Sequence, residues 1–265
     1  MGEARGEARG EGRVALSLEG PVARVVFDRP AARNAMTFAM YDELLAACET
    51  IDATPGVRAA VLRGAGGAFV SGTDIAEFAG FATGEHGVAY ERRVEAVVSR
   101  LEALRVPTLA AIDGAATGGG LALAAACDLR LVTTRSRLGV PIARSLGNCL
   151  STANLARLLR GFGAGPTRRM LLLAELLDGE EARALGFALD CVEPAAFEER
   201  VEAVVERLCA GAPLTLAATR EALARLERAA PPDDADLVAR VYASADFREG
   251  VAAFLAKRKP DWRGA

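Results

Sequence analysis

Two glycine-rich turns are the segments of this sequence best suited to chemistry. The first reads GGAFVSGTDI at residues 66–75, and the second contains three consecutive glycines at residues 118–120. Glycine lets a ligand atom approach the backbone closely. Backbone N–H groups in such turns suit an oxygen atom that becomes anionic during a reaction. Two turns that each aim one N–H at the same point would form an oxyanion hole.

The second turn lies between elements that can hold it rigidly. An apolar strand is expected at residues 107–112, and residues 121–127 carry no polar side chain. A strand, a glycine turn and an apolar helix together are typical of a helix buried at the centre of a domain. Its N-terminus would add the positive end of the helix dipole. Tight packing would explain these glycines equally well, but the first turn, after a strand at residues 57–62, favours a functional role.

The composition excludes several classes of function. The 265 residues are 51% hydrophobic and carry a net charge of −3, so they offer no positive field for nucleic acid or an anionic membrane. Five scattered cysteines without CxxC spacing favour a reducing compartment, and hence a cytoplasmic protein, over a zinc site or a disulfide frame. The single histidine excludes a multi-histidine metal site. No apolar run is suited to spanning a membrane.

The order of elements predicts an α/β fold with a mostly parallel sheet and a helical C-terminal part. Strands are expected at residues 13–19, 22–28, 57–62, 107–112, 129–133 and 188–192. Helices are expected at residues 38–52, 91–104, 121–127, 151–159, 167–177, 180–185, 197–210, 214–226, 233–242 and 247–258. Residues 76–88 lack a clean period and are expected to be partly helical and mobile. The predicted divisions are a disordered tail at 1–12, a core at 13–195 and a helical part at 196–265.

Several motifs give the chain a resemblance to a known family. In chain order they are Arg29-Pro30, Arg33-Asn34-Ala35-Met36, residues 67–75, residues 107–114, Gly118-Gly119-Gly120, Cys127-Asp128, residues 179–186, Phe254 and Lys257-Arg258-Lys259. In this order and spacing, over residues 14–262, the chain resembles the crotonase superfamily of enoyl-CoA hydratases, isomerases and their relatives.

The resemblance implies a crotonase-like spiral of ββα units whose C-terminal helices form a homotrimer or a dimer of trimers. The ligand would be an acyl-CoA thioester, with coenzyme A present only as part of the substrate and no permanently bound cofactor. The backbone N–H groups of Thr73 and Gly119 would form the oxyanion hole. The residues implied to bind coenzyme A are Arg33 at the phosphates, Ala35, Ser71, Asp74 and Ile75 along its path, and Lys257 of a neighbouring subunit.

The resemblance fails at the two acids that a hydratase of this family uses to add water to a double bond. The first normally lies three residues after the middle glycine, where this chain has Ala122. The second normally follows a Gly-x-Pro motif, and here Gly139-Val140-Pro141 is followed by Ile142. Neither side chain can transfer a proton. Standard hydration is therefore not expected, and the apolar side chains at these positions predict an apolar acyl pocket.

Other polar residues could take the place of the missing acids. Ser145, Asn148 and Cys149 lie in the loop expected to face the acyl group, and Asn148 can both donate and accept a hydrogen bond. A buried, inert Cys149 is the better interpretation of that thiol. His86 and Tyr90 belong to the segment expected to cover the pocket, and for both a chance position on the surface is favoured.

Two readings of function remain open. The chain is either an acyl-CoA enzyme with unusual acid and base residues or a catalytically silent acyl-CoA-binding protein. The enzyme reading includes isomerisation, C–C cleavage, decarboxylation and thioester hydrolysis. A serine peptidase on a related fold is excluded because the only histidine, His86, precedes the central helix. A purely backbone role for Thr73 predicts that Thr73→Ala is nearly silent.

Overall fold

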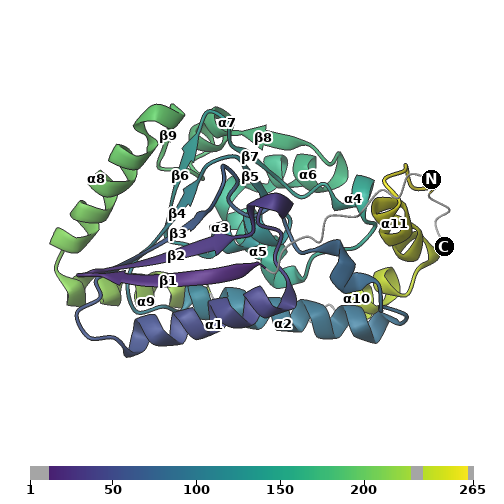
Figure 1. The fold of residues 1–265 in the computed structure, drawn as a ribbon, viewed down its shortest axis with the longest axis horizontal. Coiled ribbons are helices and arrows are strands. Elements are labelled where there is room, and N and C mark those ends of the chain that lie inside the picture. Colours follow the sequence, from purple (N-terminus) through teal and green to yellow (C-terminus); the bar gives the residue numbers. More distant parts are fainter. Residues whose placement is uncertain (1–11, 228–234, 262–265) are drawn as a thin grey trace, which may run out of the picture.

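The structure is a computed structural model that describes residues 12–227 and 235–261. Its fold consists of a twisted sheet flanked by helices (Figure 1). The spatial order of its strands is β1 (Arg13–Glu19), β2 (Val22–Asp28), β3 (Ala59–Gly64), β4 (Thr108–Ile112), β6 (Leu129–Thr133) and β9 (Asp190–Val192). β1 and β2 pair antiparallel, and every following pair is parallel. The mostly parallel sheet is confirmed.

A second, smaller sheet lies where the glycine turns meet. It consists of β5 (Ala115–Thr117), β7 (Arg137–Gly139) and β8 (Leu176–Asp178). The sequence analysis assigned none of these strands, since three residues are too few to show an alternating pattern. β5 continues the chain from β4 and leads directly into the central helix, so this sheet fixes the start of that helix.

Helices cover both faces of the large sheet. On one face lie α1 (Phe38–Ala53), α2 (Gly84–Glu102) and α3 (Gly119–Ala126), whose apolar residues share one core with β2, β3 and β4. The opposite face packs against α8 (Phe197–Ala210) through Phe197, Val201, Val204 and Val205. A strand buried on both faces explains the continuous apolar run in β4.

Figure 1 also shows the remaining helices, which include those of the C-terminal part. They are α4 (Ile142–Ser145), α5 (Thr152–Phe162), α6 (Ala164–Leu172), α7 (Gly179–Ala184), α9 (Pro213–Glu227), α10 (Ala235–Tyr242) and α11 (Ala245–Leu255), with short 3-10 turns at Pro30–Ala32, Ile75–Phe78 and Pro194–Ala196. None of the helices in residues 12–227 and 235–261 is long and apolar enough to cross a bilayer. The tail predicted at 1–12 lies, except for Gly12, outside the described residues.

Side-chain hydroxyls cap the N-termini of two helices. The hydroxyl of Thr37 accepts a hydrogen bond from the N–H of Met40 (3.2 Å) at the start of α1. Ser151 does the same for Asn154 (3.3 Å) at the start of α5. Each cap satisfies an N–H that has no partner within its helix. The capping residues Thr37 and Ser151 thus mark where these helices begin.

The start of α2 was predicted seven residues too late. The helix begins at Gly84, although glycine weakens a helix. A Cβ on Gly84 would collide with the backbone of Ala239, and one on Gly87 with the ring of Tyr242. Both of these partners lie on α10. The glycines therefore allow α10 to pack closely on α2, a tertiary reason that periodicity cannot reveal.

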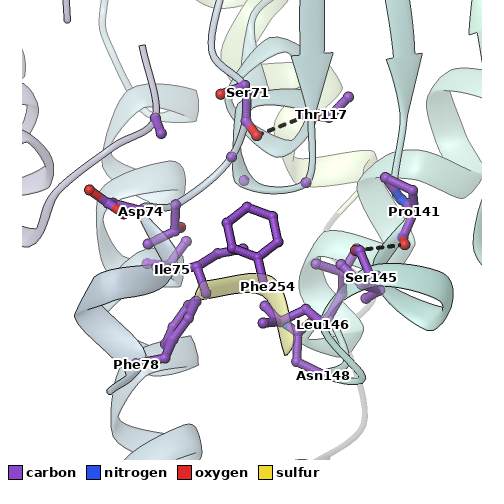
Figure 2. A pocket seen from close by; sticks show the side chains of 18 of the residues that line it. Ser71, Asp74, Ile75, Phe78, Thr117, Pro141, Ser145, Leu146, Asn148 and Phe254 are labelled. Atoms are coloured by element: carbon purple, nitrogen blue, oxygen red, sulfur yellow. Dashed lines mark hydrogen bonds between the residues drawn. The ribbon is translucent and has the colours of Figure 1, made fainter. Parts of the chain in front are cut away.

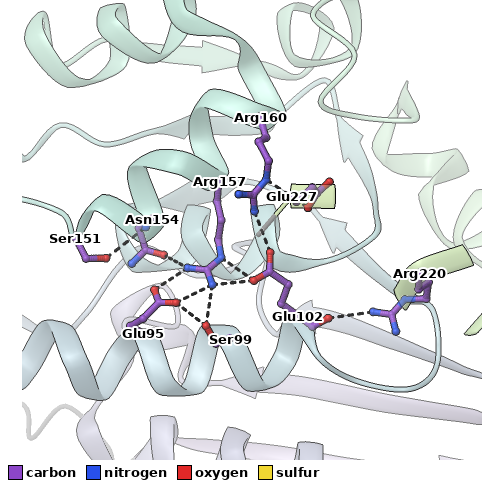
Figure 3. Close-up of polar contacts among 9 residues, drawn as sticks. All are labelled: Glu95, Ser99, Glu102, Ser151, Asn154, Arg157, Arg160, Arg220 and Glu227. Carbon is purple, nitrogen blue, oxygen red and sulfur yellow. Dashed lines mark hydrogen bonds and ion pairs between the residues drawn. The ribbon is translucent and has the colours of Figure 1, made fainter. Parts of the chain in front are cut away.

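A buried arginine ties α5 to α2 (Figure 3). The guanidinium of Arg157, whose side chain is 4% exposed, donates to both carboxylate oxygens of Glu95 (2.6 and 2.8 Å). It also donates to Glu102 (2.8 Å), Ser99 (3.0 Å) and Asn154 (3.0 Å). Such a network holds α2 and α5 in one arrangement because an unpaired charge at this depth is costly.

Candidate functional site

A cavity of about 350 Å³ opens between the two glycine turns, α2 and the segment around α4. Figure 2 shows Ser71 and Thr117 at one side of this cavity, with Ser145, Leu146 and Asn148 at the other. Phe254 of α11 extends over it. The cavity therefore lies at the carboxyl ends of β3 and β4, where parallel sheets usually bind ligands.

The first turn presents one backbone donor to the cavity. Gly72 has a φ of 113°, which favours glycine. On either side of Thr73, the carbonyl of Gly72 accepts from Met36 N–H and the N–H of Asp74 donates to Met36 (both 2.8 Å). The N–H of Thr73 itself donates to no other group in the described part of the chain. Thr73 lines the cavity, so this N–H is available to a ligand.

The second turn presents another donor. Gly118 has a φ of 54° and precedes α3, which begins at Gly119. The N–H of Gly118 donates to Gly139 (3.0 Å), whereas that of Gly119, in the first turn of the helix, has no acceptor among the described residues. Gly119 also lines the cavity. The helix behind it is apolar throughout, so the dipole at its N-terminus is poorly screened by solvent.

Hydrogen bonds between β5 and the first turn fix the two turns against each other. The N–H of Thr117 donates to the carbonyl of Val70, and its hydroxyl donates to the carbonyl of Ser71 (both 3.0 Å; Figure 2). A Cβ placed on Gly119 would lie 3.4 Å from the hydroxyl of Thr73. The structure thus places Thr73 and Gly119 side by side at one end of the cavity.

The side chain of Thr73 links two tyrosines. Its hydroxyl is 2.9 Å from the hydroxyl of Tyr41 on α1 and 2.7 Å from that of Tyr90 on α2. Burial raises the pKa of Tyr41 to about 12 and that of Tyr90 well above its ordinary value. Because these hydroxyls depend on Thr73, we no longer expect Thr73→Ala to be nearly silent.

A second polar network includes a carboxylate that the sequence analysis did not identify. Glu91 of α2 lines the cavity and accepts hydrogen bonds from the Tyr242 hydroxyl (2.9 Å) and the Ser151 N–H (3.0 Å). Tyr242 in turn accepts a hydrogen bond from the amide nitrogen of Asn148 (3.3 Å). Glu91 lies three residues before the inward Val94, and that helical spacing could have identified it as buried. The link to Tyr242 gives no sequence signal.

The two positions at which the family pattern has acids differ in their surroundings. Ile142 lines the cavity at the start of α4, as expected. Ala122 is 2% exposed within the apolar core and is not among the residues that line the cavity. Of the two side chains expected to make the acyl pocket apolar, Ile142 therefore lines the cavity and Ala122 does not, because the first turn of α3 places Ala122 in the core.

The residues implied to bind coenzyme A occupy one side of the cavity. Arg33, Ala35, Ser71 and Ile75 line it, and so does Asp74. The carboxylate of Asp74 forms a buried ion pair with Arg29 (2.7 Å) and accepts from the N–H of Ala76 (3.1 Å), so it braces the turn. Arg33 is exposed, and its guanidinium makes no hydrogen bond or ion pair within residues 12–227 and 235–261.

Three residues singled out in the sequence lie away from the cavity. Lys257 is exposed at the end of α11 and does not line the cavity of this single chain. His86 is exposed in the first turn of α2, where its Nδ1 accepts a hydrogen bond from the N–H of Ala82 (3.0 Å). Cys149 is half-buried next to Asn148 but is not among the lining residues. The structure therefore gives His86 a local role at the start of its helix.

Comparison with known proteins identifies the family of this chain. The family model described as enoyl-CoA hydratase/isomerase matches residues 18–265. The (E)-benzylidenesuccinyl-CoA hydratase of Thauera aromatica is 32% identical over 260 residues, covering 95% of this chain and 99% of the relative. The short-chain-enoyl-CoA hydratase of Clostridium acetobutylicum is 30% identical over 251 residues, covering 93% and 95%.

Solved structures show the same fold. The crystal structure of an enoyl-CoA hydratase/carnitine racemase from Magnetospirillum magneticum has a TM-score of 0.79 at 35% identity and covers 97% of both chains. A methylmalonyl-CoA decarboxylase, at 24% identity and a TM-score of 0.86, shares the fold. The match of a family model to most of the chain, together with these relatives, shows that the chain belongs to the enoyl-CoA hydratase/isomerase family.

Proposed function

We propose that this protein binds an acyl-CoA thioester and stabilises negative charge on the thioester oxygen with the backbone N–H groups of Thr73 and Gly119. One observation carries the proposal: two N–H groups without an acceptor among the described residues come from two turns that are bonded together at one cavity. Fixed donors in a site with little water stabilise developing charge strongly. Relatives named for enoyl-CoA substrates support the choice of an acyl-CoA ligand.

The proposed reaction passes through an enolate or another oxyanion, and it is not the standard hydration that uses two acids. Position 142 holds isoleucine, and alanine 122 is buried in the core. The carboxylates that line the cavity among the described residues are Asp74, which is ion-paired with Arg29, and Glu91, which accepts from Tyr242 and Ser151. Both are engaged in holding backbone and helices.

Within this class, the site favours reactions that form the enolate without removing a proton from carbon. In decarboxylation, the bond between the α-carbon and the carboxylate breaks and CO₂ leaves. The electron pair of that bond stays on the α-carbon and forms the enolate, which then takes a proton from water. In hydrolytic C–C cleavage of a β-ketoacyl thioester, water adds to the β-carbonyl, the bond between the α- and β-carbons breaks, the β-acyl group leaves as a carboxylic acid, and the electron pair of the broken bond becomes the enolate, which is then protonated. Such reactions need the oxyanion hole but no base at positions 122 or 142.

Crotonyl-CoA hydration is the first test of this proposal. We expect hydration to be about 10⁴-fold slower than that of the Clostridium acetobutylicum relative in the same assay, because two general acid–base contributions are missing. Coenzyme A binding, measured by calorimetry alongside, should persist. Efficient hydration would contradict the proposed loss of acid–base function.

A silent acyl-CoA-binding protein is the second candidate, favoured by the apolar residues at both acid positions. Malonyl-CoA, methylmalonyl-CoA and β-ketoacyl-CoA compounds form the panel that separates the two. Release of CO₂ or of a shortened acyl-CoA would support the enzyme. Tight binding without turnover of any member would favour the silent protein.

Arg33 provides a separate test of coenzyme A binding. We expect Arg33→Gln to weaken binding of coenzyme A about tenfold, because a phosphate would lose a charge-assisted hydrogen bond. Binding should also become less sensitive to salt. Pantetheine, which has no nucleotide phosphates, should bind both proteins equally. Arg92→Gln is the matched control, since Arg92 is an exposed arginine of α2 outside the cavity lining. Equal coenzyme A affinities in all three proteins would refute the assignment of Arg33.

We also propose that the C-terminal helices mediate a homotrimer or a dimer of trimers. Leu214 and Leu226 of α9 are 85% and 83% exposed, and Leu223 is 53% exposed. Apolar side chains at this density on one helix favour an interface over a solvated surface. Light scattering of the purified protein gives the number of chains directly.

A further inference from the structure

A chain of three hydroxyl groups lies beside the proposed oxyanion hole. The hydroxyl of Thr73 forms hydrogen bonds with both Tyr41 (2.9 Å) and Tyr90 (2.7 Å). A Cβ on Gly119 would lie 2.6 Å from the Tyr41 hydroxyl, which places this chain directly behind the second donor turn. The sequence analysis favoured a surface position for Tyr90, and this was wrong: the side chain is buried, because its ring packs against Phe78.

The number of protons in this chain leaves one unassigned. Three hydroxyls carry three protons, and the two hydrogen bonds to Thr73 use two, which leaves the third for the weaker contact between Tyr41 and Tyr90 or for a ligand. Tyr41 is fully buried, so a free proton there would remain an unsatisfied donor at a cost of about 1–3 kcal/mol. Tyr90 is 8% exposed and lines the cavity. The favourable arrangement has Tyr41 donating to Thr73 and Thr73 donating to Tyr90.

Thr73 could instead accept from both tyrosines and donate its own proton. A head-to-tail chain is favoured over that arrangement, because successive hydrogen bonds in one direction polarise and strengthen one another. The Tyr41 and Tyr90 hydroxyls also lie near enough to influence each other's pKa. An anionic ligand oxygen is a much stronger acceptor than a neutral phenol, so it would accept the hydrogen bond that the Tyr90 hydroxyl can donate.

We propose that the Tyr90 hydroxyl donates a third hydrogen bond to the thioester oxygen of the bound acyl group, next to the two backbone N–H groups. This inference rests on the proposed function, because it assumes an acyl-CoA in the cavity. Tyr90 is rigidly held for this role: its ring packs edge-on against Phe78, with centroids 4.8 Å apart, and lies 6.1 Å from that of Phe38.

The electrostatic surroundings of Tyr90 suit a donor and not a base. Burial, together with the nearby Tyr41 and Glu91, raises its pKa well above 10. The phenol therefore keeps its proton over the neutral and mildly alkaline range. A carboxylate at the same place would repel the developing negative charge, whereas a neutral hydroxyl stabilises it. Tyr90 thus strengthens the oxyanion hole without replacing the missing acids.

The test uses acetoacetyl-CoA, whose enolate absorbs in the near ultraviolet. We expect Tyr90→Phe to lower the ratio of enolate to keto form of the bound probe at least tenfold, because a hydrogen bond to a charged oxygen is lost. Tyr41→Phe should lower it only about twofold, since Thr73 still donates to Tyr90. Coenzyme A binding, measured on the same samples, reports whether each variant is folded.

The outcomes separate this inference from the function on which it rests. If wild-type protein binds neither coenzyme A nor acetoacetyl-CoA, the proposed function fails. If both ligands bind and Tyr90→Phe leaves the enolate ratio unchanged, the role of Tyr90 alone is refuted. A large loss in Tyr41→Phe combined with a small one in Tyr90→Phe would mean that the chain runs the other way, which also overturns the inference.

Discussion

Replacing Gly119 by proline is expected to lower oxyanion stabilisation about 10²- to 10³-fold. Proline has no N–H, and removal of one oxyanion-hole donor has an effect of this size. Gly119 is the first residue of α3, where proline fits a helix because the N–H there has no intrahelical acceptor. The substitution should therefore remove the donor without breaking the helix.

The structure shows that the single substitution would be ambiguous. Any Cβ at position 119 would lie 2.6 Å from the hydroxyl of Tyr41. A loss in Gly119→Pro could then arise from this clash. Combining each substitution with Tyr41→Phe removes the clashing oxygen, and the next nearest atom, the Thr73 hydroxyl, lies 3.4 Å away. Gly119→Ala/Tyr41→Phe and Gly119→Pro/Tyr41→Phe then share a Cβ and differ at the backbone nitrogen, where the proline ring carbon Cδ replaces the hydrogen.

The measurement compares these two double variants. The enolate fraction of bound acetoacetyl-CoA gives the effect directly, and turnover of any active acyl-CoA provides a second readout. Coenzyme A affinity and the oligomeric state should be the same in both proteins, because the nucleotide side of the cavity is unchanged. Equal enolate fractions would show that the Gly119 N–H does not contact the thioester oxygen.

Replacing Arg157 by methionine is expected to destabilise the folded protein by about 3 kcal/mol. Methionine keeps most of the aliphatic volume, so the loss reports the charge and its hydrogen bonds. Glu95 and Glu102, whose side chains are 25% and 31% exposed, both pair with Arg157 (Figure 3). Without this cation, the two partly buried carboxylates would lose their shared partner. The result should be a lower free energy of unfolding.

Arg160 is the matched control for this prediction. It also pairs with Glu102 (3.0 Å) and with Glu227 (3.4 Å), but its side chain is 35% exposed. Arg160→Met should therefore cost less than about 1 kcal/mol, as other solvent-exposed ion pairs do. Urea unfolding at neutral pH gives both values. Similar losses in the two variants would mean that burial of Arg157 contributes nothing.

Sequence alone predicted the long elements of the fold well. The strands at residues 13–19, 22–28 and 129–133 and the helix at 197–210 have the predicted bounds, because their apolar patterns are clear and their ends carry turn residues or caps. The short strands β5, β7 and β8 were missed. Their existence depends on pairing with distant segments, which no local pattern encodes.

The same distinction applies to the site. The glycine turns predicted a pair of backbone donors, the family resemblance implied that these are Thr73 and Gly119, and the structure brings the two residues together. The hydroxyls of Tyr41 and Tyr90 could not be placed, because they reach Thr73 from positions 32 and 17 residues away on two different helices. Backbone donors follow from local turn chemistry, whereas side-chain partners follow from helix packing.

The hydrogen bonds between β5 and the first glycine turn have a consequence for how this protein could diverge in evolution. Thr117, Val70 and Ser71 position the two donors largely through main-chain atoms, which every amino acid shares. Such donors have no rotamer to lose when neighbouring side chains change. The proposed oxyanion hole could then be inherited intact while the side chains around the cavity are exchanged. Such a scaffold would separate the main-chain donors, which tolerate substitutions, from the side chains that would select the reaction.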